Sequence, residues 1–430
     1  MKIILAMGLL SFILSAIAAA QVADAPDDIK AGIPVNYTEA KVGTYTLPDP
    51  LKLENGQPVT DADTWFNQRR PEIIRLYEED QYGRAPGRPG DMSWNVFDTG
   101  TPAFGGKAIR KQITIYFSAD KSGPQMDLLL YLPADAGKAV PVLLCANFFA
   151  NNLAVDDPGV KVGRRWDLKT KARVPATMPA RVFGHLNVPN VIGHGYGIAT
   201  VNYADIDPDA PGAIMQGVRA LYLKPGQTEP AADEWGTIAA WAWGLSRAMD
   251  YLQTDPGVDP NRVGLFGVSR LGKTVLWATA NDPRFSLVIA SCSGEGGAKI
   301  SRRNYGETVK HMVARYSYQF CANYAKFADD PNTLPVDGNM LISLIAPRPV
   351  LLQTGNTDRW SDPKGEFLAA VAAGPVYRLL GKDGLDTDTM PDANQPILHD
   401  IGYFMHVGPH GSLPSDWDQY FAFMQMHWKQ

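Results

Sequence analysis

The chain has 430 residues, of which 45% are hydrophobic, 20% charged and 10% aromatic, the composition of a packed globular protein. Its 40 glycines and 33 prolines follow no period, which excludes a collagen-like or low-complexity chain. The formal net charge is −5 and no run of lysine or arginine stands out, so we expect no nucleic-acid partner.

The first twenty residues have the pattern of a cleaved export signal. Met1-Lys2 precedes an apolar stretch that ends in the small residues Ala18-Ala19-Ala20. This pattern predicts a signal peptide over residues 1–20 and a secreted or periplasmic mature protein, with an uncleaved N-terminal anchor as the alternative. No other stretch approaches the ~20 apolar residues needed to cross a bilayer, so no membrane partner is expected.

After a polar N-terminal arm, short apolar runs alternate with helical patterns. Strands are predicted at 112–117, 126–132, 140–146, 196–202, 262–266, 286–290 and 349–354, and helices at 65–82, 234–252 and 271–280. Apolar strands separated by helices predict a parallel sheet covered on both faces, and hence an α/β fold. We expect one domain over 21–430 with an N-terminal extension to about 105. The segment 156–195, which is rich in proline, glycine and basic residues, is predicted to be an insertion over one end of the sheet.

Ser269 is the strongest candidate for a nucleophile. An apolar strand leads into Gly267-Val-Ser269, and a helix follows directly, which is how a strand-to-helix elbow exposes a serine at the end of a sheet. The helix N-terminus offers free N–H groups to a developing oxyanion. The second glycine of the generic G-x-S-x-G motif stands one place late, at Gly272, and a serine that only caps the helix is the alternative.

A serine nucleophile needs a base and an acid that orients it, and in an α/β-hydrolase fold these follow in the order Asp or Glu, then His. Asp358 follows the predicted strand 349–354, and His410 stands in the tight loop Gly408-Pro-His410-Gly. Asp362 is the local rival for the acid. A metal pair of His406 and His410 would need a helix, which this loop argues against, and no cofactor or metal site is predicted.

The residues around these positions resemble the bacterial glucuronoyl esterases, carbohydrate esterase family 15, over most of the mature chain. The resemblance rests on Gly267-Val-Ser269-Arg-Leu-Gly-Lys273, Ser293-Gly-Glu295, Ser301 to Glu307, Thr357-Asp358-Arg-Trp360 and Gly408-Pro-His410. It implies a three-layer α/β-hydrolase fold with active-site insertions. It also implies a secreted serine esterase that cleaves esters between glucuronoyl groups of xylan and lignin alcohols.

The same resemblance implies roles for the residues around the serine. Ser269 would attack the ester carbonyl with His410 as its base, and Arg270 would add a guanidinium to the oxyanion donors. Lys273 and Glu307 would bind sugar hydroxyls, and Trp360 would pack against the sugar. The alternatives are solvated charges for Arg270 and Lys273, a surface acid for Glu307 and core packing for Trp360.

One departure concerns the acid of the triad. Many family members have a glutamate directly before the Ser-Gly that follows the next strand, and here that place is Cys292, which cannot serve as a carboxylate. Some bacterial members place the acid after a later strand, and Asp358 fits that pattern. We therefore expect Ser269, His410 and Asp358 to form the triad, with Asp362 or Glu295 as the acids that could replace Asp358.

Two other functions stay open from the sequence. An acetyl- or feruloyl-type carbohydrate esterase would use the same scaffold, and a non-catalytic carbohydrate-binding relative would use the exposed aromatics alone. The complete order of serine, acid and histidine favours an enzyme. We expect a monomer whose partner is its glucuronoxylan or lignin-carbohydrate ester substrate. Three cysteines allow at most one disulfide, so the fold must depend on its core.

Overall fold

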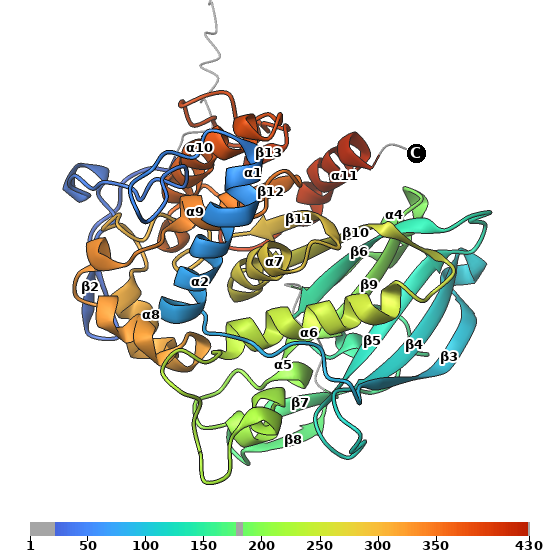
Figure 1. The fold of residues 1–430 in the computed structure, drawn as a ribbon. Coiled ribbons are helices and arrows are strands. Elements are labelled where there is room, and N and C mark those ends of the chain that lie inside the picture. Colours follow the sequence, from blue (N-terminus) through green and yellow to red (C-terminus); the bar gives the residue numbers. More distant parts are fainter. Residues whose placement is uncertain (1–21, 178–183, 429–430) are drawn as a thin grey trace, which may run out of the picture.

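A mixed β-sheet forms the centre of the protein (Figure 1). The computed structural model describes residues 22–177 and 184–428, and within them this sheet has nine strands in the order β13-β12-β11-β10-β6-β9-β5-β4-β3. Its strands are β3 (Ser93–Ala103), β4 (Ala108–Tyr116), β5 (Gln125–Pro133), β6 (Val140–Asn147), β9 (Gly197–Asn202), β10 (Val258–Val268), β11 (Phe285–Ser291), β12 (Val350–Gly355) and β13 (Ile401–His406). The predicted signal peptide lies outside the described residues.

The strands from β13 to β9 are parallel, as predicted for apolar runs that alternate with helices. The β3, β4 and β5 strands are antiparallel to one another, and β5 is antiparallel to β9. Short connections join β3 to β4 and β4 to β5, and such turns can only connect antiparallel neighbours. The predicted N-terminal extension therefore contributes an edge strand, β3, to the main sheet.

Helices cover both faces of the sheet and produce the predicted three-layer α/β fold. The helices are α1 (Ala62–Thr64), α2 (Arg70–Asp80), α3 (Asn151–Ala154), α4 (Val188–Gly193), α5 (Tyr203–Ile206), α6 (Thr237–Leu252), α7 (Arg270–Asn281), α8 (Val309–Tyr316), α9 (Gly338–Ser343), α10 (Pro363–Leu379) and α11 (Trp417–His427). In Figure 1, α6 and α7 cross the near face of the sheet. None of the helices in the described part of the chain combines the length and apolarity that crossing a membrane requires.

Two apolar cores form on the two faces because side chains alternate along each strand. On β6, Val142 and Leu144 pack into the core with α6, α7 and α10, whereas Leu143 and Cys145 pack into the core with α4 and α11. All eight residues of β6 are buried, which explains why this strand reads as a continuous apolar run.

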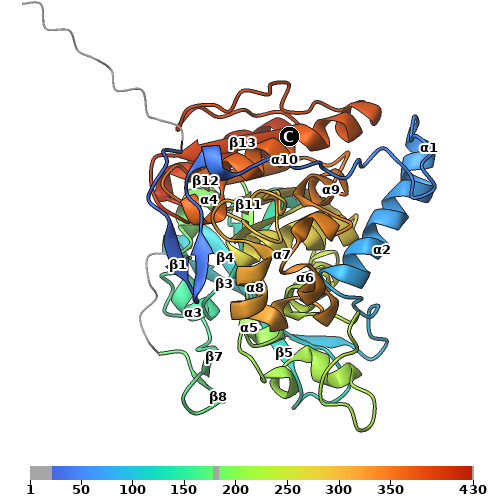
Figure 2. The same cartoon turned by 90° about the vertical axis from the view of Figure 1, so that its left-hand side faces the viewer.

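Two short hairpins lie outside the main sheet. The β1 (Asp28–Lys30) and β2 (Ile33–Val35) strands pair near the N-terminus, and Figure 2 shows this blue segment beside the C-terminal part of the chain. The β7 (Arg164–Asp167) and β8 (Ala172–Pro175) strands form the second hairpin, inside the predicted insertion 156–195. The insertion therefore has ordered structure of its own.

Candidate active site

Ser269 stands at the junction between β10 and α7. Its backbone has φ 61° and ψ −126°, a conformation that non-glycine residues rarely adopt. The hydrogen bond from its N–H to the carbonyl of Ser291, 2.7 Å long, ties this turn to the end of β11. The strained turn exposes part of the serine at the carboxyl edge of the parallel strands, as the motif predicts.

Two glycines permit this turn. A Cβ at Gly267 would overlap the carbonyl of Leu271 on the helix above it, and a Cβ at Gly272 would lie 2.8 Å from the carbonyl of Ser291. The late second glycine of the motif is therefore required where α7 passes the end of β11.

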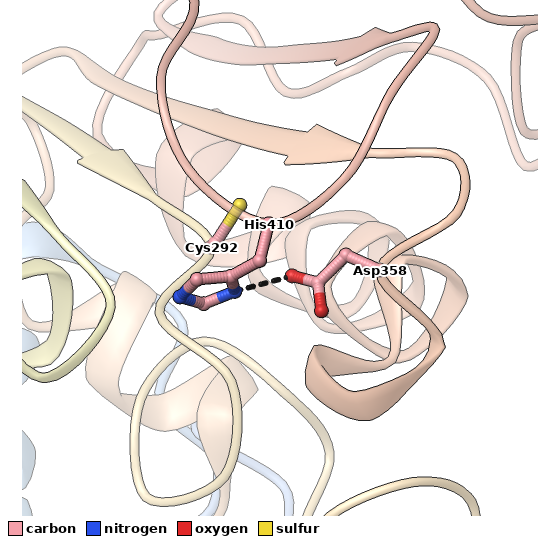
Figure 3. A group of neighbouring side chains, drawn as sticks. All are labelled: Cys292, Asp358 and His410. Carbon is pink, nitrogen blue, oxygen red and sulfur yellow. Dashed lines mark hydrogen bonds and ion pairs between the residues drawn. The ribbon is translucent and has the colours of Figure 1, made fainter. Parts of the chain in front are cut away.

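His410 and Asp358 form a short hydrogen bond. Nδ1 of His410 lies 2.6 Å from Oδ2 of Asp358, as Figure 3 shows, and 3.2 Å from Oγ of Ser361. Asp358 follows β12 and its side chain is 3% exposed, whereas the His410 side chain is 35% exposed. Burial alone would raise the pKa of Asp358, but hydrogen bonds from His410 and Ser361 hold it below its ordinary value. The carboxylate therefore stays ionised beside the imidazole.

The loop that carries His410 is held by hydrogen bonds to its neighbours. Nδ1 of the buried His406 lies 2.8 Å from Oδ2 of Asp416, and its Nε2 lies 2.9 Å from the carbonyl of Pro409. Burial would lower the pKa of His406, but these two acceptors raise it above its ordinary value. Both ring nitrogens are engaged, so His406 cannot offer one to a metal ion shared with His410.

Cys292 lies beside His410 (Figure 3). Its Sγ, a carboxylate oxygen of Asp358 and a ring nitrogen of His410 lie within 4.8 Å of one another. Burial and the charge of Asp358 raise the pKa of the thiol well above its ordinary value, so it stays protonated. A protonated thiol is a poor metal ligand and cannot replace a carboxylate. The three cysteines of the chain are all buried and none forms a disulfide.

Arg270, the residue after the serine, is held in one direction by an ion pair. Its guanidinium contacts Oδ2 of Asp209 and lies over the ring of Tyr316, 4.9 Å from the ring centre. Asp209 also accepts hydrogen bonds from Tyr318 at 2.9 Å and Gln319 at 2.7 Å. The interpretation of Arg270 as a freely solvated charge is therefore wrong.

Lys273 and Glu307 are both buried beside the serine turn, with 3% and 7% of their surface exposed. Burial lowers the pKa of Lys273 and raises that of Glu307, and the charge of each opposes the shift of the other. The alternatives of a solvated lysine and a surface acid are therefore wrong. A buried pair of this kind suits the recognition of hydroxyl groups, since it offers one cationic donor and one anionic acceptor.

Trp360 lies next to Glu307. Its carbonyl accepts a 2.8 Å hydrogen bond from the N–H of Glu307, and its half-buried ring meets His311 edge-on at 5.1 Å between ring centres. The guanidinium of Arg315 lies 5.6 Å from the centre of the same ring. The ring therefore belongs to the same part of the site as the Lys273–Glu307 pair, and part of it remains exposed.

The two rival acids bind other partners. Asp362 caps the start of α10 through the N–H of Gly365 at 2.9 Å and forms an ion pair with Arg303 at 2.9 Å. Glu295 forms a fully buried ion pair with Lys299, 2.9 Å long. In the structure Asp358 is the carboxylate that contacts His410.

Sequence reasoning missed the residues that support the site. Asp209 lies in a loop with no motif, and Asp416 stands just before α11 with no local pattern that marks it. Glu366 is buried in the first turn of α10, where its Oε1 accepts hydrogen bonds from the N–H of Gly294 at 2.6 Å and Oγ of Ser293 at 3.2 Å. Burial raises the pKa of Glu366 to about 8. A carboxylate in the first turn of a helix is ordinary, so no sequence signal marks this one.

Comparisons with known proteins agree with the geometry. A family model described as fungal glucuronyl esterase matches residues 170–381. The chain is 44% identical to carbohydrate esterase MZ0003 from an unknown prokaryotic organism, over 91% of this chain and 92% of that one. It is 32% identical to 4-O-methyl-glucuronoyl methylesterase 1 of Wolfiporia cocos, over 78% and 72% of the two chains. A solved glucuronoyl esterase structure from Solibacter usitatus superposes with a TM-score of 0.87 at 46% identity and covers 91% of this chain and 100% of that one.

Proposed function

The chain belongs to the glucuronoyl esterase family of carboxylic ester hydrolases, and on that basis we propose that it hydrolyses ester bonds between (4-O-methyl)glucuronoyl groups of xylan and lignin alcohols. The observation that carries the proposal is the 2.6 Å contact between His410 and Asp358, at the same sheet edge as the strained turn of Ser269.

In the proposed mechanism Oγ of Ser269 attacks the ester carbonyl carbon while Nε2 of His410 accepts its proton. Asp358 holds the proton on Nδ1 and stabilises the imidazolium that forms. The carbonyl oxygen becomes an oxyanion, which the N–H groups of the first turn of α7 and the guanidinium of Arg270 stabilise. The C–O bond to the alcohol then breaks, and the alcohol leaves with the proton from His410. Water, activated by His410, then hydrolyses the glucuronoyl-serine ester, which restores the Ser269 hydroxyl and leaves the xylan-linked glucuronate with a free carboxylate.

Recognition of the sugar is assigned to Lys273, Glu307 and Trp360. An esterified glucuronate has no free carboxylate, so its binding must come from its hydroxyl groups and ring face. The Lys273–Glu307 pair supplies a donor and an acceptor, and the exposed part of the Trp360 ring supplies an apolar surface. A buried site built for hydroxyls penalises a ligand that lacks them, because its own polar groups then stay unpaired.

The remaining features of the proposal concern export and assembly. Residues 1–20 have the pattern of a cleaved signal peptide, which supports secretion or export to the periplasm. We propose a monomer with one catalytic domain over 21–430, since one sheet with two cores includes both β3, from the N-terminal extension, and the C-terminal β13. N-terminal sequencing of the exported protein and sedimentation analysis test these two points.

The test of the function is a comparison of two substrates. The enzyme is expected to hydrolyse a methyl or benzyl glucuronate ester at a much higher kcat/KM than an acetylated xylose derivative, and Ser269→Ala is expected to abolish both activities. A preference for the acetylated sugar would favour an acetyl esterase instead. Failure of a serine-directed phosphonate to label Ser269 would favour a non-catalytic binding protein.

A further inference from the structure

The insertion builds a groove of about 680 Å³ at the carboxyl edge of the parallel strands. One wall is the β7–β8 hairpin, and the other is the start of β5 together with the segment that follows β9. In the sheet β9 lies two strands, about 10 Å, from β10, and the groove opens at the same edge of the sheet as the Ser269 turn. In Figure 1 the hairpin lies beside α5, which follows β9 directly.

The hairpin is fastened to the sheet edge by side-chain hydrogen bonds. Asn202, the last residue of β9, donates from Nδ2 to the carbonyl of Arg164, 3.2 Å away. Arg173 donates to the carbonyl of Gln216 at 3.0 Å and forms an ion pair with Asp205 at 3.5 Å. These contacts give the groove fixed walls, although it lies on the surface.

Basic side chains dominate the charge of the groove. Four cationic residues line it against two anionic ones: Lys161, Arg164, Lys171 and Arg173 against Asp127 and Asp205. The two acids are already neutralised, because Lys161 contacts Asp127 at 2.8 Å and Arg173 contacts Asp205. Arg164 and Lys171 are exposed and form no ion pair with any of the described residues.

The lining also indicates which ligands the groove does not suit. It contains no aromatic ring among the described residues, and its exposed large hydrophobic side chains are Val162 and Met215. Neutral sugars and lignin aromatics are bound mainly through ring faces and apolar surface. Two unpaired cations instead favour a carboxylate, above all through the planar guanidinium of Arg164.

We propose that this groove binds a free uronate carboxylate on the polysaccharide that carries the scissile ester. The proposal rests on the proposed function and narrows its substrate to acidic xylan, in which unesterified glucuronate groups stand near the esterified one. It assigns a role to the insertion: Arg164 and Lys171 hold a neighbouring negative charge while the ester reaches Ser269.

A binding measurement tests the groove without any catalysis. Calorimetry at low salt would compare the wild-type protein with Arg164→Gln/Lys171→Gln, titrated with a xylo-oligosaccharide that carries one free glucuronate. An exposed ion pair contributes a factor of about 1.4–5, so the double variant is expected to bind about 2- to 25-fold more weakly. The matched control, Lys138→Gln/Lys326→Gln, removes two exposed cations outside the groove and is expected to bind as the wild type does. Equal affinity of all three proteins would overturn the proposal.

Kinetics on three esters separate this proposal from the proposed function. The double variant is expected to lose kcat/KM only on an oligosaccharide ester with a second, free glucuronate, and to match the wild type on the same ester without it and on benzyl glucuronate. If the wild type hydrolyses none of the three esters, the proposed function fails, while calorimetry still shows whether the groove binds a free glucuronate. If the double variant instead changes the preference between benzyl and methyl esters, the groove receives the alcohol and the uronate proposal is wrong.

Discussion

Asp358→Asn tests which carboxylate orients His410. In the wild type Oδ2 of Asp358 faces Nδ1 of His410 at 2.6 Å, and Oδ1 accepts from the N–H of Ser361 at 3.4 Å. In the variant the single amide oxygen is expected to keep the Ser361 N–H, so the amide NH₂ faces Nδ1. The imidazole must then carry its proton on Nε2, where it cannot accept the proton of Ser269.

The size of the loss follows from the ion pair that forms when His410 is protonated. Two unit charges about 4 Å apart near a protein surface, at an effective dielectric constant of about 20, interact by about 4 kcal/mol. That energy corresponds to a factor of about 10³ in rate, and the wrong tautomer adds to it. We therefore expect kcat to fall by about 10³- to 10⁴-fold with little change in KM.

The assay is steady-state hydrolysis of benzyl glucuronate by matched variants. Asp362→Asn keeps a capping oxygen but loses the charge that pairs with Arg303, so it is expected to lower stability while the folded enzyme keeps its kcat within about tenfold. Cys292→Ala is expected to keep kcat within the same range. An Asp358→Asn enzyme within tenfold of the wild type would refute the assignment of Asp358 as the orienting acid.

A second variant asks whether position 292 can supply the missing acid. Sγ of Cys292 lies within 4.8 Å of the reacting atoms of Asp358 and His410, so a glutamate there could place a carboxylate beside the imidazole. Cys292→Glu in the Asp358→Asn background is expected to recover at least about tenfold of the lost kcat. No recovery in a folded double variant would show that the backbone at 292 directs its side chain away from Nδ1.

Arg270→Ala is expected to lower kcat on a glucuronate ester about 10²- to 10³-fold with little change in KM, because an oxyanion donor acts mainly in the transition state. A change in KM alone would assign Arg270 to substrate binding. Lys273→Ala and Glu307→Ala are each expected to lower kcat/KM on glucuronate esters by about 1.5–3 kcal/mol while most activity on p-nitrophenyl acetate remains. Equal losses on both esters would contradict a role in sugar binding. Burial raises the pKa of Glu366 from 4.5 to about 8, so between these pH values the side chain takes up a proton on folding and wild-type stability falls as pH rises through this window. Melting temperatures measured between pH 5 and 8 are therefore expected to show that Glu366→Gln gains stability relative to the wild type as the pH rises. Melting temperatures of the two proteins that change with pH in parallel would count against this reasoning.

Features whose signal is local were predictable from the sequence. The strand-to-helix elbow at Ser269 is encoded in about ten consecutive residues, and the buried parallel strands read as continuous apolar runs. The fold class is confirmed by the sheet and its two helical layers. The edge strand β3 was missed because six of its eleven residues are exposed and it contains two threonines, a glycine and a proline.

Tertiary structure decided which side chains meet. Asp358 and His410 are 52 residues apart and Arg270 and Asp209 are 61 apart, so no local pattern can encode either pair. Loop paths at the carboxyl edge of the sheet bring them together, and the same paths turn Glu295 toward Lys299. The sequence by itself therefore predicted a candidate nucleophile and the order of the candidate catalytic groups, and it identified the family. The 2.6 Å contact between Asp358 and His410, the burial of Lys273 and Glu307, and the charged groove of the insertion became visible only in the folded chain, because contacts between distant residues depend on packing rather than on periodicity.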